Sequence, residues 1–364
     1  MGKRMAALAL AVCMALPLFG CGGKLKAQSL TEGITARTID THTDLTGDST
    51  AVMDFAAALL RQTAESEGVL LSPVSVLYAL GMTANGASGD TLTQLEQVMG
   101  MDLTALNDYL YTYRMSLPEN TKKCKLSLSN SLWLRDIFHV DDAFLNTCAN
   151  YYGAEAYRSA FDDSLVTDLN RWVDNKTDGM ISSLLDQPPT DRTMLYLVNA
   201  VCFDAKWQEP YEKSDIETGT AFTAADGTRQ TADLLWSKES VYLSDDNTTG
   251  FLMYFDGGRY AFVWLLPSEG VPIADYVAGL TGGKLHALLN EHRYGTVEAA
   301  IPRFTASSSL ELNDALKAMG VTDAFDASHA DLRAMGSAPN DQLYVSAVLH
   351  KTYLSLDEIG RAHV

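Results

Sequence analysis

Serine, histidine and aspartate all occur in this chain, but they are not spaced as the common catalytic motifs require. The seven histidines are scattered singly, and no GxSxG, HExxH, GxGxxG or phosphate-loop pattern is present. The adjacent carboxylates of Asp141 and Asp142 point in opposite directions in an extended chain, as in a solvated turn. The spacing therefore indicates a protein that is not an enzyme and needs no cofactor. A triad assembled only in the folded chain stays open as the alternative.

Four polar residues stand in strongly apolar surroundings. Ser72 and Ser75 begin an apolar helix, Asn199 is the one amide in the run "TMLYLVNAVCFDAKW", and His350 lies in the closing strand pattern. A buried polar group without a partner costs about 1–3 kcal/mol, so we expect each of the four to be hydrogen bonded. Either each has its own backbone partner or the four form one network.

The elements that would position these residues alternate irregularly between helix and strand. Pro73 suits the first position of a helix and Ser72 its cap, and the next residues are apolar on most sides, which predicts a buried helix. Helical spacing returns at 164–179, and strand patterns occupy 125–134, 193–207, 260–267, 296–304 and the closing segment. These patterns predict one α+β domain with large antiparallel sheets, from about residue 49 onward.

The N-terminus has the features of an export signal. Lys3 and Arg4 precede an apolar run over 5–19 that is too short to span a bilayer. The run closes with "LFGC", which resembles the bacterial lipobox, so we expect residues 1–20 to be a lipoprotein signal peptide and Cys21 to carry the lipid. Residues 21–48 lack sustained periodicity and are predicted to be a linker that holds an extracellular domain at the cell-surface membrane. The alternative is an ordinary cleaved signal before an unmodified cysteine.

The charge balance is strongly acidic. With 27 basic and 46 acidic residues, the formal charge is −19. Nucleic acid and anionic lipid surfaces are poor partners for such a chain, and repulsion between copies favours a soluble monomer. Cys124, Cys148 and Cys202 show neither CxxC nor Cys/His spacing, so they are expected to be buried apolar residues without a disulfide framework or metal site.

Six blocks of the chain, in order, resemble the serpin family over nearly everything from about residue 50 to 358. The first includes "LLSPVSVLYALGMTANGASGDT" and the last "LYVSAVLHKTYLSLDE". Residues 69–100 resemble helix B with the segment after it, 128–161 the next strand and helix region, and 169–185 helix F. Residues 197–211 resemble the third strand of sheet A, 301–332 the segment before the final strand of that sheet, and 343–358 that final strand. The resemblance implies the serpin fold, with a large, mostly antiparallel sheet A, further sheets and surrounding helices.

The resemblance also assigns roles to the isolated polar residues. They match the family's shutter, a hydrogen-bond cluster beneath the centre of sheet A where two strands must part: Ser72, Ser75, Asn199 and His350. This favours one connected network, whose bonds can be exchanged when the sheet opens.

Residues near the top of sheet A have counterparts in the family as well. Trp207 matches the breach, and Arg303 with Glu358 match a salt bridge there. Glu358 and Gly360 match the beginning of the hinge, which leads into an exposed loop. In serpins a target protease attacks that loop and forms an acyl-enzyme, and the cut loop inserts into sheet A. The resemblance therefore implies an inhibitor of serine or cysteine proteases.

The last six residues, 359–364, read "IGRAHV". Arg361 stands where the family has a small residue, and burying its charge with an inserting loop would be costly. The six codons can be written as part of a sequencing-library adapter, so this tail is expected to be non-native. On that interpretation the chain is truncated before the reactive loop and the terminal strands, and cannot inhibit as written. The alternative function is a non-inhibitory, serpin-like surface protein that binds a ligand or partner.

Overall fold

The computed structural model describes residues 25–34, 37–41, 43, 45–64, 68–224, 227–339 and 343–359. The helices are α1 (Leu45–Thr63), α2 (Pro73–Asn85), α3 (Gly89–Met99), α4 (Leu103–Ser116), α5 (Asp142–Tyr152), α6 (Asp163–Lys176), α7 (Ile273–Ala278), α8 (Gly282–Asn290) and α9 (Asn313–Met319). The strands are β1 (Gln28–Ser29), β2 (Cys124–Arg135), β3 (His139–Val140), β4 (Glu155–Ser159), β5 (Leu195–Ala205), β6 (Ile216–Thr223), β7 (Arg229–Ser244), β8 (Thr248–Tyr254), β9 (Ala261–Pro267), β10 (Arg293–Pro302), β11 (Phe304–Glu311), β12 (Gly336–Ser337) and β13 (Leu349–Leu356).

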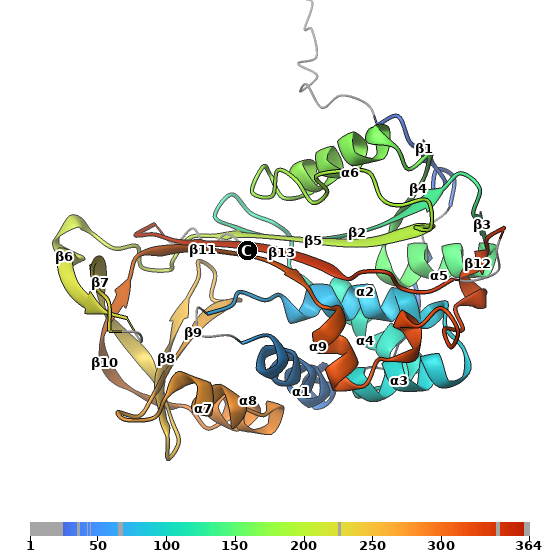
Figure 1. The fold of residues 1–364 in the computed structure, drawn as a ribbon. Coiled ribbons are helices and arrows are strands. Elements are labelled where there is room, and N and C mark those ends of the chain that lie inside the picture. The colour runs from blue at the N-terminus through green and yellow to red at the C-terminus, as the bar shows by residue number, and fades with distance from the viewer. Residues whose placement is uncertain are drawn as a thin grey trace, which may run out of the picture.

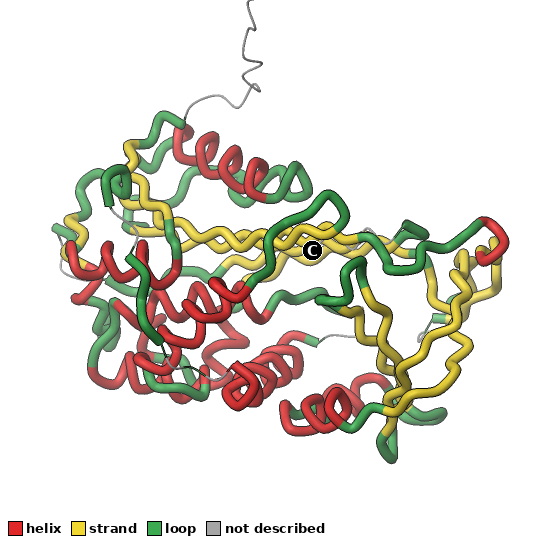
Figure 2. Tube along the Cα trace, turned by 180° about the vertical axis from the view of Figure 1, so that it is seen from behind, coloured by secondary structure: helices red, strands yellow, loops and turns green. Residues whose placement is uncertain are grey.

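The strands form two larger sheets and two ribbons. The first sheet has the order β1-β4-β2-β5, in which only β4 and β2 are parallel, and the second has the order β10-β7-β8-β9, with β6 added to β7. The ribbons are β11–β13 and β12–β3. Figure 1 shows α6 above the first sheet and α2 below it, and Figure 2 shows the second sheet at the opposite end of the molecule from most helices. The predicted α+β class is confirmed, and the expected large sheet consists of the first sheet and the β11–β13 ribbon.

Helix α2 is buried, as its apolar sequence predicts. Leu77, Tyr78 and Met82 are almost fully enclosed between the other helices and the first sheet. Pro73 stands at the beginning of the helix, as expected, but the Ser72 side chain does not cap it. The Ser72 hydroxyl instead shares a hydrogen bond with the Ser75 hydroxyl, because Ser75 lies one turn further along the same helix.

Helix α6 packs on the opposite face of the first sheet. Its stripe of Leu165, Leu169 and Trp172 contacts Trp133 of β2 and Val198 of β5. Strand β5 is thus covered on both faces, as its continuous apolar sequence predicts.

Described residues of the segment expected to be a linker contact the domain. In β1, Gln28 and Ser29 pair with β4, and the backbone N–H of Arg37 donates to the Asn150 side chain. Helix α1 begins at Leu45, before the predicted boundary at residue 49. The sequence did not indicate this because short, irregular segments gain their order from backbone hydrogen bonds to other elements, which leave no periodicity.

The cysteines follow the prediction with one exception. All three described cysteines are free thiols, and Cys148 and Cys202 are buried, whereas Cys124 is partly exposed at the first residue of β2. Among the described residues, no cluster of three or more histidines, cysteines or carboxylates is arranged to hold a metal ion. Within the same residues, no helix is both long and apolar enough to cross a bilayer.

Candidate functional site

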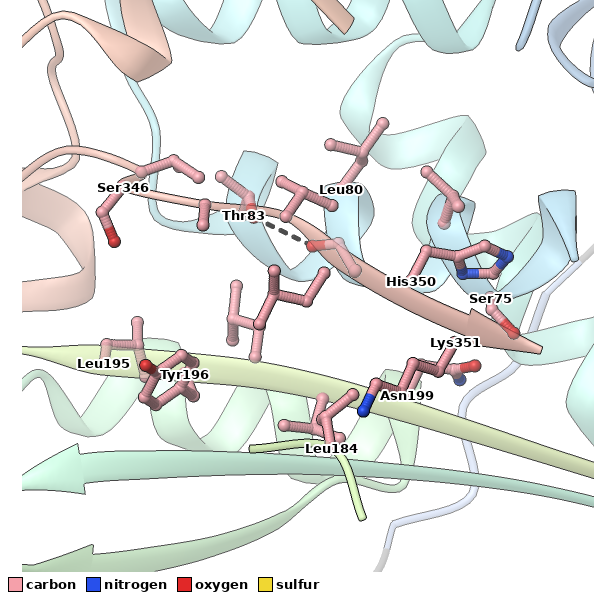
Figure 3. Close-up of a pocket in the computed structure, with 18 of the residues that line it drawn as sticks. Ser75, Leu80, Thr83, Leu184, Leu195, Tyr196, Asn199, Ser346, His350 and Lys351 are labelled. Carbon is pink, nitrogen blue, oxygen red and sulfur yellow. Dashed lines mark hydrogen bonds between the residues drawn. The ribbon is translucent and has the colours of Figure 1, made fainter. Parts of the chain in front are cut away.

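A groove separates β5 from β13 and runs along the middle of the molecule. A cavity of about 140 Å³ is lined by residues 192–201, by residues 343–352 and by one face of α2 from Ser75 to Thr83. Figure 3 shows Leu195 and Ser346 toward one end and Asn199 and Lys351 toward the other, so the two strands run in the same direction. Strand β5 pairs only with β2, and β13 only with β11, within the described part of the chain. Each strand therefore turns an edge without a strand partner toward the groove.

One wall of the groove carries a polar cluster made by α2 and β13. The backbone N–H of Ser72 donates to Nε2 of His350 over 3.0 Å, and the Ser72 and Ser75 hydroxyls are 2.8 Å apart. The His350 side chain is 6% exposed, and burial lowers its pKa from 6.5 to about 4. Because Nε2 accepts a hydrogen bond, the ring is neutral with its proton on Nδ1. Nε2 is thus already engaged by a backbone donor and does not serve as a base for either hydroxyl.

The fourth residue of the expected cluster belongs to the other wall. The side-chain amide of Asn199 donates to Oδ1 of Asn130 over 2.7 Å, and Asn130 donates to the backbone carbonyl of Tyr152 over 2.7 Å. Oδ1 of Asn199 is buried and has no hydrogen-bond partner among the described residues. The structure therefore joins Ser72, Ser75 and His350 and places Asn199 in a second chain of hydrogen bonds.

Sequence reasoning missed Asn130, although a signal was present. It is a lone amide in the alternating pattern of β2 and lies directly opposite Asn199 in the antiparallel register. Two amides facing each other in neighbouring apolar strands can share a hydrogen bond, which here satisfies Oδ1 of Asn130 but leaves Oδ1 of Asn199 without a partner among the described residues.

The groove is closed at the end where β5 and β13 finish. The Trp207 indole N–H donates to the backbone carbonyl of Asp357 over 3.1 Å, and its backbone N–H donates to the carbonyl of Ile359 over 3.2 Å. The Trp207 ring stacks on Phe255, with centroids 4.5 Å apart. The two hydrogen bonds from Trp207 must break before the strands can separate at this end.

The Arg303–Glu358 ion pair lies at the same end. Its nitrogen and oxygen are 3.5 Å apart, and the side chains are 49% and 32% exposed. A pair as exposed as this contributes about 0–1 kcal/mol to stability, so Trp207 supplies the stronger contact here. Gly360, the second expected hinge residue, and Arg361 lie outside the described residues, as does the expected lipid attachment residue Cys21.

The segment after α6 covers the groove. Val173 of α6 and the three apolar residues Ile181, Leu184 and Leu185 line it. The Lys351 ammonium donates to the backbone carbonyl of Ser183 over 3.1 Å, which connects β13 to this cover. The arrangement is suited to holding an extended chain, because a strand placed in the groove would meet two backbone edges, an apolar floor and an apolar cover.

The fold and this groove define a protein whose central sheet is parted in the middle. The family model described as "Serpin (serine protease inhibitor)" matches residues 50–363, and the chain belongs to this family. The family description names inhibitors of serine proteases.

Solved structures and curated relatives agree with this assignment. The thermophilic serpin tengpin in its native state is 36% identical, with a TM-score of 0.87 and coverage of 93% of this chain and 87% of that chain. In its latent state tengpin matches with 37% identity, a TM-score of 0.83 and coverage of 90% and 89%. Neuroserpin of Gallus gallus is 29% identical over 83% of this chain and 76% of its own length. Corticosteroid-binding globulin of Oryctolagus cuniculus is 31% identical over 90% of this chain and 87% of its own length.

Proposed function

We propose that the protein inhibits serine or cysteine endopeptidases. A loop after β13 is attacked by the protease and then enters the groove between β5 and β13 as an additional strand of the large sheet. The observation that carries this proposal is the groove between β5 and β13. A segment that reverses direction after β13 runs antiparallel to it. It is then antiparallel to β5 as well, because β5 and β13 run in the same direction. Such a strand can pair with both open edges at once.

The polar groups in the groove support the same proposal. His350 and Asn199 stand on opposite walls, and Oδ1 of Asn199 is a buried acceptor without a partner in the described structure. A guest strand brings backbone N–H groups into this space, and a hydrogen bond to that oxygen would remove its desolvation penalty of about 1–3 kcal/mol.

Incubation of the complete gene product with a panel of serine and cysteine proteases tests this function. We expect at least one protease to form a covalent complex that survives SDS electrophoresis. Occupying the groove beforehand with an acetylated peptide of about ten alternating alanine and threonine residues, the length of a strand, is the matched control. The blocked protein should be cleaved without forming the complex. Cleavage without a complex by every protease of the panel, with the groove empty, would contradict the proposal.

The second candidate is a non-inhibitory serpin that binds a ligand or partner. The 31% identity to a protein named for corticosteroid binding favours it. Thermal unfolding before and after proteolysis of the loop separates the two candidates. An inhibitor should gain stability when its cleaved loop fills the groove, whereas a binding protein should show no such gain.

We propose further that the protein is exported, lipid-anchored through Cys21 at a bacterial cell surface, and acts as a monomer. The apolar run over 5–19 and the "LFGC" sequence support the anchor, and the charge of −19 supports the monomer. Cys21→Ser should move the protein from the membrane fraction to the soluble fraction, and unchanged membrane association would argue against lipidation.

A further inference from the structure

Residues 25–30 are bound to the edge of the first sheet. Gln28 and Ser29 pair with Arg158 and Tyr157 of β4, and the backbone N–H of Leu30 donates to the carbonyl of Ala156 over 2.8 Å. Strand β1 thereby becomes the outermost strand of this sheet. A two-residue strand is weak by itself, so the segment needs other contacts to stay in place.

A buried carboxylate of α6 supplies those contacts. Oδ2 of Asp168 accepts hydrogen bonds from the backbone N–H groups of Lys26 and Ala27, each over 2.7 Å. The Asp168 side chain is 1% exposed, so water does not replace these donors while α6 stays in position. Hydrogen bonds to an ionised acceptor are stronger than neutral ones. Without the two N–H donors, the buried carboxylate would keep only its ion pair with Arg171, in which the nitrogen and Oδ1 are 3.7 Å apart, and would pay a desolvation penalty.

Apolar contacts reinforce this attachment. Leu25 and Ala27 pack against the cluster that joins α6 to the first sheet, which includes Leu165, Leu169 and Trp172. The segment therefore holds α6 through the Asp168 carboxylate and through apolar contacts, and β1 holds the segment to β4.

Helix α6 is also the element that carries the cover of the groove. Asn170 of α6 accepts the backbone N–H groups of Leu184 and Leu185, over 2.7 and 2.9 Å, and so ties the covering segment to the helix. The same covering segment is bonded to β13 by Lys351. Helix α6 lies above the first sheet (Figure 1), and a movement that lifts it would pull the covering segment through Asn170 and work against the Lys351 bond to β13.

We infer that residues 25–30 act as a clasp that holds α6 and its covering segment closed over the groove, and that release of this segment opens the groove. The inference rests on the proposed function only for the identity of the strand that enters. The hold on α6 follows from the contacts of Asp168, of β1 and of the apolar side chains of Leu25 and Ala27.

Hydrogen exchange measured by mass spectrometry on the full chain tests the clasp. Ala27→Pro removes one of the two N–H donors to Asp168 and keeps an apolar side chain against the α6 cluster, and Lys26→Ala is the matched control, because it keeps both backbone donors. Asp168→Ala is the second variant, with Asp174→Ala as a control that removes a carboxylate of the same helix for which the described structure shows no side-chain hydrogen bond. Loss of these bonds should accelerate exchange in α6 and in residues 181–185 by roughly ten- to a hundredfold, with the controls like wild type.

Unchanged exchange in α6 and 181–185 in Ala27→Pro would overturn the clasp. Uptake of the acetylated alanine–threonine peptide, monitored by native electrophoresis, provides the second measurement. Faster peptide uptake by Ala27→Pro than by Lys26→Ala supports the inference. Equal uptake by the two proteins, despite faster exchange in α6 of Ala27→Pro, would overturn the claim that release of residues 25–30 opens the groove. If every protein, wild type included, excludes the peptide, the proposed function is contradicted and the exchange result alone decides the clasp.

Discussion

The free energy of unfolding should fall as the pH falls from about 6.5 to about 4, because His350 binds a proton in the unfolded chain and not in the folded protein. Burial lowers the pKa of His350 from 6.5 to about 4 in the folded protein, whereas the unfolded chain titrates at the ordinary value. Between these values the unfolded state binds a proton that the folded state refuses, so stability falls as the pH falls and levels off below about pH 4. At about 1.4 kcal/mol for each pKa unit, the loss amounts to about 3 kcal/mol. Nε2 of His350 accepts a hydrogen bond from the backbone N–H of Ser72. Protonation of Nε2 would remove this acceptor and place two N–H groups against each other.

Urea unfolding at several pH values, monitored by tryptophan fluorescence, measures this loss. Carboxylates titrate in the same range, so the useful quantity is the difference between wild type and His350→Gln, whose amide oxygen can still accept the Ser72 N–H. Between about pH 7 and pH 4.5, wild type should lose about 2 kcal/mol more than the variant. Ser75→Ala is the control: it should lower stability by a similar amount at every pH, because it removes a hydroxyl hydrogen bond and leaves the imidazole in place. Identical pH profiles for wild type and His350→Gln would refute the reasoning.

Three further predictions concern other parts of the structure. Trp207→Phe keeps an aromatic ring on Phe255 but deletes the indole hydrogen bond to Asp357, just after β13. The free energy of unfolding should therefore fall by about 1 kcal/mol. An unchanged free energy of unfolding would show that this bond does not hold the groove closed. Burial acts to raise the pKa of Glu155, but the hydrogen bonds that its carboxylate accepts from α6 and β4 outweigh burial and lower the pKa. Glu155→Gln should therefore be less stable than wild type at neutral pH, and the difference should shrink as the pH falls through the folded pKa of the carboxyl group. A stability difference that does not depend on pH would contradict this. Gly250→Ala places a Cβ 2.2 Å from a backbone oxygen of β9 and should cost about 1–3 kcal/mol in urea unfolding, whereas Gly283→Ala, which meets nothing within 4 Å, should be neutral.

Long apolar patterns were predicted well because burial imposes them on the sequence. The run that contains Asn199 became β5, the helical stripe at 164–179 became α6, and the helix after Ser72 is enclosed on nearly all sides. In each case the hydrophobic effect acts on the residues of one element, so its result can be read from local spacing.

Contacts made by backbone groups were predicted poorly. Residues 25–34 have no periodicity, yet they form the edge strand β1 and provide the donors for Asp168. Backbone N–H groups are the same in every residue except proline, so the sequence does not show which of them meets a distant carboxylate. The same limit applies to Ser72, whose side chain was expected to cap α2, while its backbone N–H is the group that bonds His350.

The sequence alone determined which polar residues would lie in apolar surroundings and therefore needed partners, because the types of their neighbours dictate burial. Only the tertiary structure decided the partners. It joined His350 to Ser72 on one wall, joined Asn199 to Asn130 on the other, and left the groove between them. The physical reason is that a hydrogen bond depends on distances of about 3 Å between groups far apart in the chain, and those distances are set by how β5 and β13 pack against α2 and α6.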